Sequence, residues 1–388
     1  MKNIALRLII LFFWIAPFSV SAYDSELLLE MRSKMPPPNL SVVSWVMMNP
    51  DTGIIIAGEN LNKKIEPASL SKLMTAYIVF REIRRGNISL EEEVVISERA
   101  WRTGGSRMFI EPDERISVEN LLLGMIVQSG NDAAVALAEH IAGSEESFAG
   151  LMNQVAIELE LNNSHFANST GWPDPEHFST ARDITLIAAA IIREFPAMYG
   201  YYSIREFTWN NITQHNRNPL LDRDESIDGI KTGYTEAAGY CLIGSAKQDG
   251  LRIIATVFGS ESSRDRAEAV YALLKYGFAA YEMHHVYRAG SAVVSAVPVY
   301  KGDRSSVAIG VSQDIQLIMP KGAGSGLEAS IEIDEPLIAP LEEEQQVGHL
   351  MLSLEGKEIA NYTLVTLGPI NQGSWPSRML DTIRLRLK

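Results

Sequence analysis

The stretch Pro67-Ala-Ser-Leu-Ser-Lys-Leu-Met-Thr75 is the part of this 388-residue sequence from which fold and chemistry can first be read. Apolar residues at 73, 76, 77 and 80 have the i, i+3, i+4, i+7 spacing of a helix with one buried face, so we predict a helix over 69–85. Ser69 and Lys72 are three residues apart, which places both side chains on one side of the helix start. A serine becomes a nucleophile when a neighbouring base takes its proton, and a lysine whose pKa is lowered by burial can be that base.

Two further short motifs follow in a fixed order. Ser129-Gly130-Asn131 lies 60 residues after Ser69, at the break between helices predicted over 117–127 and 131–141. Lys231-Thr232-Gly233 lies 102 residues after Ser129, at the head of a strand predicted over 231–235. A Ser-x-x-Lys alone occurs on the order of once by chance in a chain of this length, whereas three such signals in order are specific.

This motif set resembles that of active-site-serine β-lactamases and penicillin-binding proteins. Residues 67–75, 128–134, 179–183 and 228–240 are similar to D-alanyl-D-alanine carboxypeptidases, the low-molecular-mass penicillin-binding proteins of peptidase family S11 type. The likeness covers nearly the whole mature chain. It implies an α/β (α+β) catalytic domain of the serine β-lactamase/penicillin-binding-protein type, with helices around an antiparallel sheet. A small all-β C-terminal domain and a terminal amphipathic helix are implied beside it.

The resemblance also implies a role for each motif residue. Ser69 would be the acylated nucleophile, Lys72 its base, and Ser129 a proton relay between the lysines and the leaving amine. Lys231 would keep Lys72 partly neutral through its positive charge. The substrate-binding residues would be Asn131, Arg217, Lys231, Thr232, Gly233 and Tyr234.

Within that set, Asn131 would hold the amide region of the substrate, and Thr232 with Arg217 would grip the terminal carboxylate. The backbone N–H groups of Ser69 and Tyr234 would form the oxyanion hole. Close relatives often carry histidine where this chain has Tyr234, so we expect a different pH dependence or substrate preference. The segment between residues 91 and 108 also looks shorter than in the best-known members.

The implied activity is removal of the terminal D-Ala from peptidoglycan stem pentapeptides through an acyl-enzyme on Ser69, with β-lactam antibiotics acylating the same serine. No metal or cofactor is implied. One alternative is a class A-like β-lactamase, because Glu158-Leu-Glu-Leu-Asn162 matches the pattern that activates the deacylating water in that class. The 29 residues between Ser129 and Glu158 are too few for that family, and 158–162 is typical of a helix end. A second alternative is a catalytically minor peptidoglycan-binding scaffold protein.

Composition and the two ends of the chain suggest where the protein acts. Residues 1–22 carry Lys2 and Arg7, an apolar run over 8–18 and the small-residue end Val-Ser-Ala, which together predict a secretory signal peptide. Its removal takes the net charge from -14 to -16. An acidic surface repels phosphate, so we expect no nucleic-acid partner.

The predicted organisation is a signal peptide (1–22), a catalytic domain (23–284), a β-rich domain (285–370) and a membrane-anchor helix (371–388). The β-rich domain is predicted from short β-prone runs over 293–300, 306–311, 315–319, 328–333 and 359–367. The last 15 residues combine one broad apolar face with four basic residues and one acid, although Leu385 and Arg386 depart from the pattern. Such a helix is expected to lie on an anionic membrane surface, and the alternative is a helix packed on its own protein or a frayed tail. The protein is therefore expected to be periplasmic and peripherally attached to the inner membrane.

Four residues outside the motifs carry minor predictions. The single cysteine, Cys241, lies in an apolar stretch and is expected in the core. His177 is expected on the surface, near a loop that faces the site. Asp183 is expected to cap or pin a helix. The pair His284-His285 has no third ligand at a usable spacing, so a zinc site is not expected.

Overall fold

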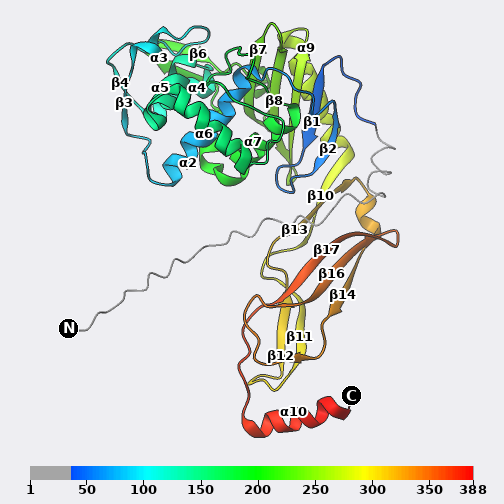
Figure 1. Ribbon diagram of the computed structural model, residues 1–388. Coiled ribbons are helices and arrows are strands. Elements are labelled where there is room, and N and C mark those ends of the chain that lie inside the picture. The colour runs from blue at the N-terminus through cyan, green and yellow to red at the C-terminus, as the bar shows by residue number, and fades with distance from the viewer. Residues whose placement is uncertain (1–35, 388) are drawn as a thin grey trace, which may run out of the picture. The chain divides into compact units, whose positions relative to one another are not determined.

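The computed structural model describes residues 36–387 (Figure 1), so the predicted signal peptide at 1–22 lies outside the described residues. The described chain forms two compact units. The first contains residues 36–286 and 316–324, and the second contains residues 287–315 and 325–387. Residues 316–324 thus group with the first unit, although the sequence places them in the β-rich domain.

The first unit is built on a five-stranded antiparallel sheet with strand order β2-β1-β9-β8-β7. The strands are β1 (Ser44–Met48), β2 (Ile55–Glu59), β7 (Ile227–Thr235), β8 (Gly239–Gln248) and β9 (Leu251–Ser260). Asp249 and Gly250 both have positive φ, as the tight turn of a β8–β9 hairpin requires. The strand predicted over 231–235 is part of β7, a separate edge strand that precedes this hairpin.

Two helices cover opposite faces of this sheet. On one face, Gly277 of α9 (Ser263–Ala280) approaches Ile253 so closely that a Cβ at Gly277 would lie 2.4 Å from Ile253 Cδ1. On the other face, Thr185 of α7 (Ala181–Glu194) makes a 2.6 Å hydrogen bond to Thr256. Residues 253 and 256 of one strand point to opposite faces because side chains alternate along a strand.

A cluster of helices beside the sheet holds the nucleophile segment. It contains the short 3₁₀ helix η1 (Ala68–Ser71), which leads into α2 (Lys72–Arg84). Every residue of α2 from Lys72 to Arg81 is buried, so this helix is central. Its neighbours are α3 (Glu98–Arg102), α4 (Val118–Val127), α5 (Asn131–Ala142), α6 (Glu145–Glu158) and α8 (Pro196–Tyr199).

Smaller elements lie in the first unit or cross its boundaries with the second along the chain. Two-stranded antiparallel sheets pair β3 (Glu93–Val95) with β4 (Arg115–Ser117) and β5 (Glu206–Trp209) with β6 (Ile212–His215). Another sheet pairs β10 (Tyr281–Tyr287) with β13 (Ile315–Pro320). The remaining 3₁₀ helices are η2 (Gly200–Ser203), η3 (Pro219–Asp222) and η4 (Ala323–Gly326).

The second unit contains a six-stranded sheet of order β14-β16-β17-β12-β11-β15. Its strands are β11 (Ala292–Tyr300), β12 (Ser306–Gly310), β14 (Leu327–Ile333), β15 (Leu337–Ile338), β16 (Gln346–Leu354) and β17 (Lys357–Thr366). The predicted all-β character of this domain is confirmed. Strands β15 and β16 were not predicted.

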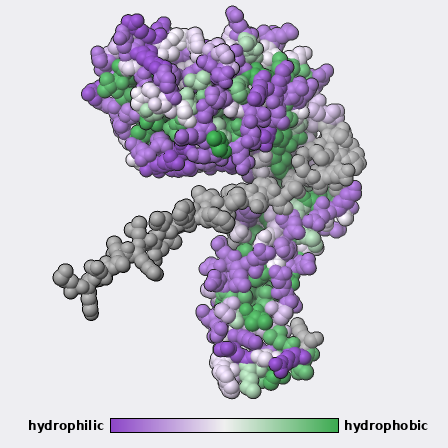
Figure 2. Space-filling view, in the orientation of Figure 1, coloured by the Kyte–Doolittle hydropathy of each residue, from purple (hydrophilic) through white to green (hydrophobic). Residues whose placement is uncertain are grey.

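The chain ends in the helix α10 (Trp375–Leu387). Asp381 faces its own domain, where its carboxylate accepts a 2.7 Å hydrogen bond from the backbone N–H of Lys301. An apolar row at every fourth position, Trp375, Met379, Ile383 and Leu387, is more than half exposed. Hydrophobic and hydrophilic surfaces lie side by side at this end of the second unit (Figure 2). No helix within residues 36–387 is long and apolar enough to cross a membrane.

Candidate active site

The nucleophile Ser69 sits in a tightly enclosed segment. Ala68, the residue before it, has a left-handed backbone with φ 49°, which is uncommon for a residue other than glycine. Two glycines allow close approach from both sides. A Cβ at Gly171 would lie 1.7 Å from Ala68 O, and a Cβ at Gly233 would lie 3.2 Å from Ala68 Cβ. The loop around 171 and the strand β7 are thereby held against the serine.

Lys72 is buried directly behind Ser69. Its Nζ lies 3.1 Å from Ser69 Oγ, 2.6 Å from Asn131 Oδ1 and 2.8 Å from the carbonyl oxygen of Thr170. A neutral lysine has two N–H donors and one lone pair. The amide and carbonyl oxygens can accept the two N–H groups, which leaves the lone pair for the proton of Ser69.

The surroundings of Lys72 make this neutral state accessible. Burial is the largest cause and lowers its pKa from 10.5 to about 7. Arg217 lowers it further, whereas Asp132 and Glu145 raise it. Burial is therefore the main cause of the lowered pKa, and the expected effect of the Lys231 charge on Lys72 stays a prediction. Burial, together with Lys72 and Arg217, also holds the pKa of Lys231 well below its usual range.

Ser129 and Lys231 form a second buried pair. Lys231 Nζ donates a 2.8 Å hydrogen bond to Ser129 Oγ and a 3.2 Å bond to the carbonyl of Thr232. Ser129 has a left-handed backbone with φ 66°, in the break between α4 and α5. Such a conformation costs a non-glycine residue about 1–2 kcal/mol, and strain of this kind collects at functional sites.

Asn131 opens α5 and connects it to the loop at 104–106. Its Nδ2 donates to the carbonyl of Gly104 at 2.7 Å, which orients the amide so that Oδ1 faces Lys72. Its backbone N–H donates to the carbonyl of Ser106 at 2.7 Å. A Cβ at Gly105, where φ is 82°, would lie 2.7 Å from Asn131 Nδ2, so this position favours glycine.

The strand β7 carries Thr232, Gly233 and Tyr234 along an open edge of the sheet. An edge strand leaves every second backbone N–H and C=O free to pair with an extended peptide. The ring of Tyr234 is half exposed and packs 4.4 Å from the ring of Tyr240, its partner across the β7–β8 pair. Arg217 is anchored nearby, since its Nε donates to the carbonyl of Gln128 at 3.0 Å.

A pocket of about 580 Å³ opens in front of Ser69. Asn131 and Tyr234 line it with Ser69, while Lys72 lies behind them. The other lining residues are Glu66, Gly105, Ser106, Thr170, Gly171, Trp172, Pro173, Thr235, Glu236 and Ala237. The structure therefore brings the three motifs into one site, and Arg217 is linked to that site through Gln128.

The loop at 168–172 is the part of the site that sequence reasoning missed. Asn168 Oδ1 accepts hydrogen bonds from the backbone N–H groups of Thr170, Gly171 and Trp172, at 2.8–3.2 Å. Glu145 Oε1 accepts from the backbone N–H and the hydroxyl of Ser169. The loop serves Lys72 through the carbonyl of Thr170, so no side-chain motif marks it. Its turn-rich composition, Asn-Ser-Thr-Gly-Trp-Pro, was the available signal.

The predicted surface position of His177 is wrong. The residue is only 2% exposed, and its Nε2 lies 2.8 Å from Ser71 Oγ. The prediction treated a polar ring near a loop as solvent-facing, but buried hydrogen-bonding partners on both ring nitrogens satisfy it.

The predictions for Cys241 and Asp183 agree with the structure. Cys241 is fully buried, as expected, and burial raises its pKa to about 12. Asp183 pins the loop before its helix, accepting from Asn163 N and Ser164 Oγ, while the cap of α7 is Thr180. His284 lies 3.0 Å from the carboxylate of Glu282. Within residues 36–387, no three His, Cys, Asp or Glu side chains gather as a metal site would require.

Glu158 does not reach the site. Its carboxylate accepts a 2.7 Å hydrogen bond from Arg81. Arg81 lies 12 residues beyond Ser69, so Arg81 and Ser69 are about 18 Å apart along η1 and α2. Glu158 is the last residue of α6, as the helix-end interpretation expects.

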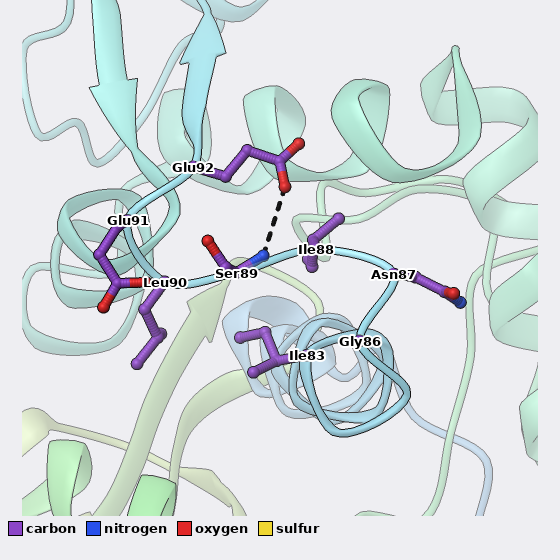
Figure 3. Close-up of a pocket in the computed structure, with 8 residues that line it drawn as sticks. All are labelled: Ile83, Gly86, Asn87, Ile88, Ser89, Leu90, Glu91 and Glu92. Carbon is purple, nitrogen blue, oxygen red and sulfur yellow. Dashed lines mark hydrogen bonds between the residues drawn. The ribbon is translucent and has the colours of Figure 1, made fainter.

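A second hollow, of about 440 Å³, lies where α2 ends and the chain runs toward β3 (Figure 3). Ile83 and residues 86–92 line it. Ser89 donates its backbone N–H to Glu92 there, at 3.3 Å, and no lysine or histidine is among the lining residues. Of the two pockets, only the first is lined by the nucleophile Ser69.

Both domains of the chain match known protein families. The family model for D-alanyl-D-alanine carboxypeptidases matches residues 31–262, and that for the penicillin-binding protein 5 C-terminal domain matches residues 281–372. The chain is 36% identical to D-alanyl-D-alanine carboxypeptidase DacC of Escherichia coli, over 95% of this chain and 92% of the relative. It is 37% identical to DacA of Haemophilus influenzae, over 96% and 95%.

Solved structures give the same result. Penicillin-binding protein 5 from Haemophilus influenzae has a TM-score of 0.80 and 38% identity, covering 87% of this chain and 99% of that one. Penicillin-binding protein 6B from Escherichia coli has a TM-score of 0.73 and 35% identity, covering 85% and 97%. The predicted penicillin-binding-protein fold is therefore confirmed. With both domains matched over nearly their whole length, the chain belongs to the D-alanyl-D-alanine carboxypeptidase family.

Proposed function

We propose that this chain is a serine-type D-Ala-D-Ala carboxypeptidase that trims peptidoglycan stem pentapeptides. The observation that carries the proposal is the buried amine of Lys72, which lies 3.1 Å from Ser69 Oγ while two other oxygens accept its N–H groups. This is the arrangement of a nucleophile with a general base whose pKa lies near neutral pH.

Acylation starts when Ser69 Oγ attacks the carbonyl of the penultimate D-Ala and its proton passes to Lys72. The negative charge on the carbonyl oxygen is stabilised by the backbone N–H groups of Ser69 and Tyr234. As the C–N bond breaks, Ser129, which is hydrogen-bonded to Lys231, gives its proton to the leaving D-Ala amine. The proton on Lys72 replaces it, so Lys72 is neutral again. Water then hydrolyses the ester on Ser69, with Lys72 again acting as base.

The substrate is bound through the charge of its terminal carboxylate and through pairing of its backbone with the edge strand of the sheet. The terminal carboxylate lies between Thr232 and Arg217, whose charge is close enough to Lys231 to lower the pKa of that lysine. The extended peptide pairs with the open edge of β7, which sits beside the nucleophile because Gly233 permits close contact with Ala68. Asn131 donates a hydrogen bond to the substrate amide or accepts one from it.

β-Lactam antibiotics are expected to acylate Ser69 in the same way, because the ring amide takes the place of the scissile peptide bond. Penicillin-binding protein D2 from Listeria monocytogenes, which is 28% identical and has a TM-score of 0.58, has been solved in ampicillin-bound and cefotaxime-bound forms. Because Glu158 is bound to Arg81 away from the site, we expect the penicilloyl-enzyme to persist. Rapid turnover of penicillin would instead favour the β-lactamase alternative.

The first test is D-Ala release from a synthetic peptide ending in Lys-D-Ala-D-Ala. Wild type should release D-Ala, and Ser69→Ala should lower the rate on the order of 10³-fold or more because the covalent route is lost. Ser89→Ala, in the second hollow, is a matched serine control that should keep full activity. Absence of release by the wild type would contradict the proposed activity and favour the scaffold alternative.

We further propose that the protein acts in the periplasm, held at the outer face of the inner membrane by α10. The support is the exposed apolar row of this helix, which adjoins Arg378, Arg384 and Arg386. Leu385, which departs from the predicted apolar face, is half-buried on the side of Asp381. The apolar pattern is thus more regular on the exposed face than the sequence suggests.

A further inference from the structure

Behind the nucleophile lies a chain of buried polar groups that the proposed chemistry does not use. Ser71 Oγ is 2.9 Å from the carbonyl oxygen of Ala68 and 2.8 Å from His177 Nε2. The backbone N–H of Ala167 donates to His177 Nδ1 at 3.3 Å. Ser71 and His177 are both almost completely buried, so water does not replace these partners.

The direction of each hydrogen bond is fixed by donor counting. The N–H of Ala167 can only donate, so His177 Nδ1 accepts and the ring proton lies on Nε2. His177 then donates to Ser71 Oγ, and the single hydroxyl proton of Ser71 goes to Ala68 O. Burial lowers the pKa of His177 to about 4, which keeps the ring neutral as this chain of bonds requires.

The last hydrogen bond of this series, from Ser71 to the carbonyl of Ala68, acts on the peptide group that carries an oxyanion donor. The carbonyl of Ala68 and the N–H of Ser69 belong to one planar trans peptide, in which they point in opposite directions. Fixing Ala68 O therefore fixes the direction of the Ser69 N–H. This peptide needs such support because Ala68 is in the left-handed region, from which a non-glycine residue gains by relaxing.

We propose that Ser71 and His177 are positioning residues that aim the Ser69 N–H into the oxyanion hole. The inference rests on the proposed function, since it assigns these residues to the stabilisation of the tetrahedral intermediate. Gly171 closes the other side of Ala68, where the loop backbone is in contact with the same carbonyl. The carbonyl is thus held by a hydrogen bond and by packing together.

The test uses Ser71→Ala, His177→Phe and His177→Gln. Ser71→Ala removes the bond to Ala68 directly, and His177→Phe keeps the ring but removes the donor to Ser71. Glutamine has one amide donor and one acceptor, so His177→Gln should restore part of the loss. His165→Phe is the matched control: His165 lies in the same loop and bonds the carbonyl of Glu176 through Nδ1, without touching residues 68–71.

Three quantities are measured for each full-length variant. Complete acylation by a fluorescent penicillin counts the folded sites, D-Ala release gives kcat and KM per site, and a peptide boronic acid reports affinity for a tetrahedral adduct on Ser69. We expect Ser71→Ala and His177→Phe to lower kcat per site about 10- to 100-fold, less than the full loss of an oxyanion donor, with KM within about twofold. Boronate affinity should fall in parallel.

A purely structural role predicts another pattern. It would lower the number of titratable sites or the melting temperature while kcat per site and boronate affinity stayed at wild-type values, and that result would overturn the proposal. If the wild type were acylated by penicillin but released no D-Ala, the proposed function would fail by itself. The acylation rate and the boronate affinity would then still decide whether Ser71 and His177 position Ser69.

Discussion

Lys72 shows how one residue's surroundings set the chemistry of the site. A lysine in water is protonated at neutral pH and cannot take a proton from serine. Burial lowers the pKa of Lys72 to about 7, while the nearby charges act in opposite directions. The amine is therefore a usable base in the neutral range, without any metal in the proposed mechanism.

The first prediction concerns pH. Acylation needs neutral Lys72, so kcat should rise with pH and level off above about 7, falling about tenfold per unit below it. Arg217 lowers the pKa of Lys72, so Arg217→Gln should move this acid limb to higher pH. Asp132 raises that pKa, so Asp132→Asn should move the limb to lower pH.

The matched control is Arg223→Gln. Arg223 pairs with Glu268 on the surface and is not among the charges that act on Lys72, so the limb should stay in place. The measurement is the profile of kcat against pH for the wild type and for the Arg217→Gln, Asp132→Asn and Arg223→Gln variants. Shifts of the same sign for Arg217→Gln and Asp132→Asn would show that the acid limb does not report Lys72.

At this scale the sequence reveals side chains better than backbone groups. Ser69, Lys72, Ser129 and Lys231 were predicted because their chemistry lies in the side chain and the motif spacing identifies it. Thr170 was missed because it contributes a carbonyl oxygen, which every residue type has. His177 was misplaced because its two partners, Ser71 Oγ and Ala167 N, come from segments that only the fold brings together.

The loop at 168–172 illustrates the scale of elements. It has no regular structure, yet Asn168, Glu145 and Thr75 hold it by hydrogen bonds to three consecutive residues. Gly171 lets this loop pack directly on the backbone of Ala68. The loop is thus as well supported as the helices beside it.

The second prediction is that Gly171→Ala lowers D-Ala release by at least about 100-fold. The added Cβ would overlap Ala68 O and push the nucleophile segment out of place, and the positive φ of 82° adds strain. Penicillin acylation should slow in parallel. Gly150→Ala is the control, since it lies within α6 with open space around it and should raise stability by about 0.5–1 kcal/mol. Wild-type activity in Gly171→Ala would show that the segment tolerates displacement.

Elements with a clear period were predicted and irregular strands were not. The helices α2, α4 and α5 agree closely with their predicted ranges. Strand β16 was missed although Leu350, Leu352 and Leu354 alternate inward. Gly348 interrupts the pattern at a register shift, where a Cβ would lie 2.2 Å from Glu332 O. A glycine that permits close strand approach looks like a loop residue in the sequence.

At the scale of the whole molecule, the last helix differs in charge from the rest of the chain. The chain carries a net charge of -14, but its last helix has basic residues beside an exposed apolar row. A mostly acidic protein gains nothing from an anionic lipid surface except through such a cationic segment. The proposed anchor therefore acts without help from the rest of the surface.

The third prediction separates the apolar contribution of α10 to membrane binding from the contribution of its positive charges. Deleting residues 374–388 should abolish sedimentation with phosphatidylglycerol-containing vesicles. Met379→Gln with Ile383→Gln keeps the charges and should weaken binding at every salt concentration. Arg378→Gln with Arg384→Gln should weaken binding by roughly 1 kcal/mol per charge at low salt, with a smaller effect at high salt.

Ile157→Gln provides the control, because it removes an exposed apolar side chain on α6, in the other unit. Its vesicle binding should equal that of the wild type. D-Ala release from a soluble peptide should be unchanged in all these variants, since none of the substituted residues lines the pocket. Full vesicle binding after the deletion would refute the anchor.

The buried thiol of Cys241 has a practical consequence. It is the only cysteine in the chain and lies on β8, between β7 and β9, with its side chain in the core. Burial raises its pKa to about 12. Thiolate is the reactive form, so the folded protein should be almost inert to maleimides. A cysteine introduced on the surface would then take up a dye or spin label at one known position. Spectroscopic distances between the catalytic unit and a vesicle could be measured without first removing a native residue.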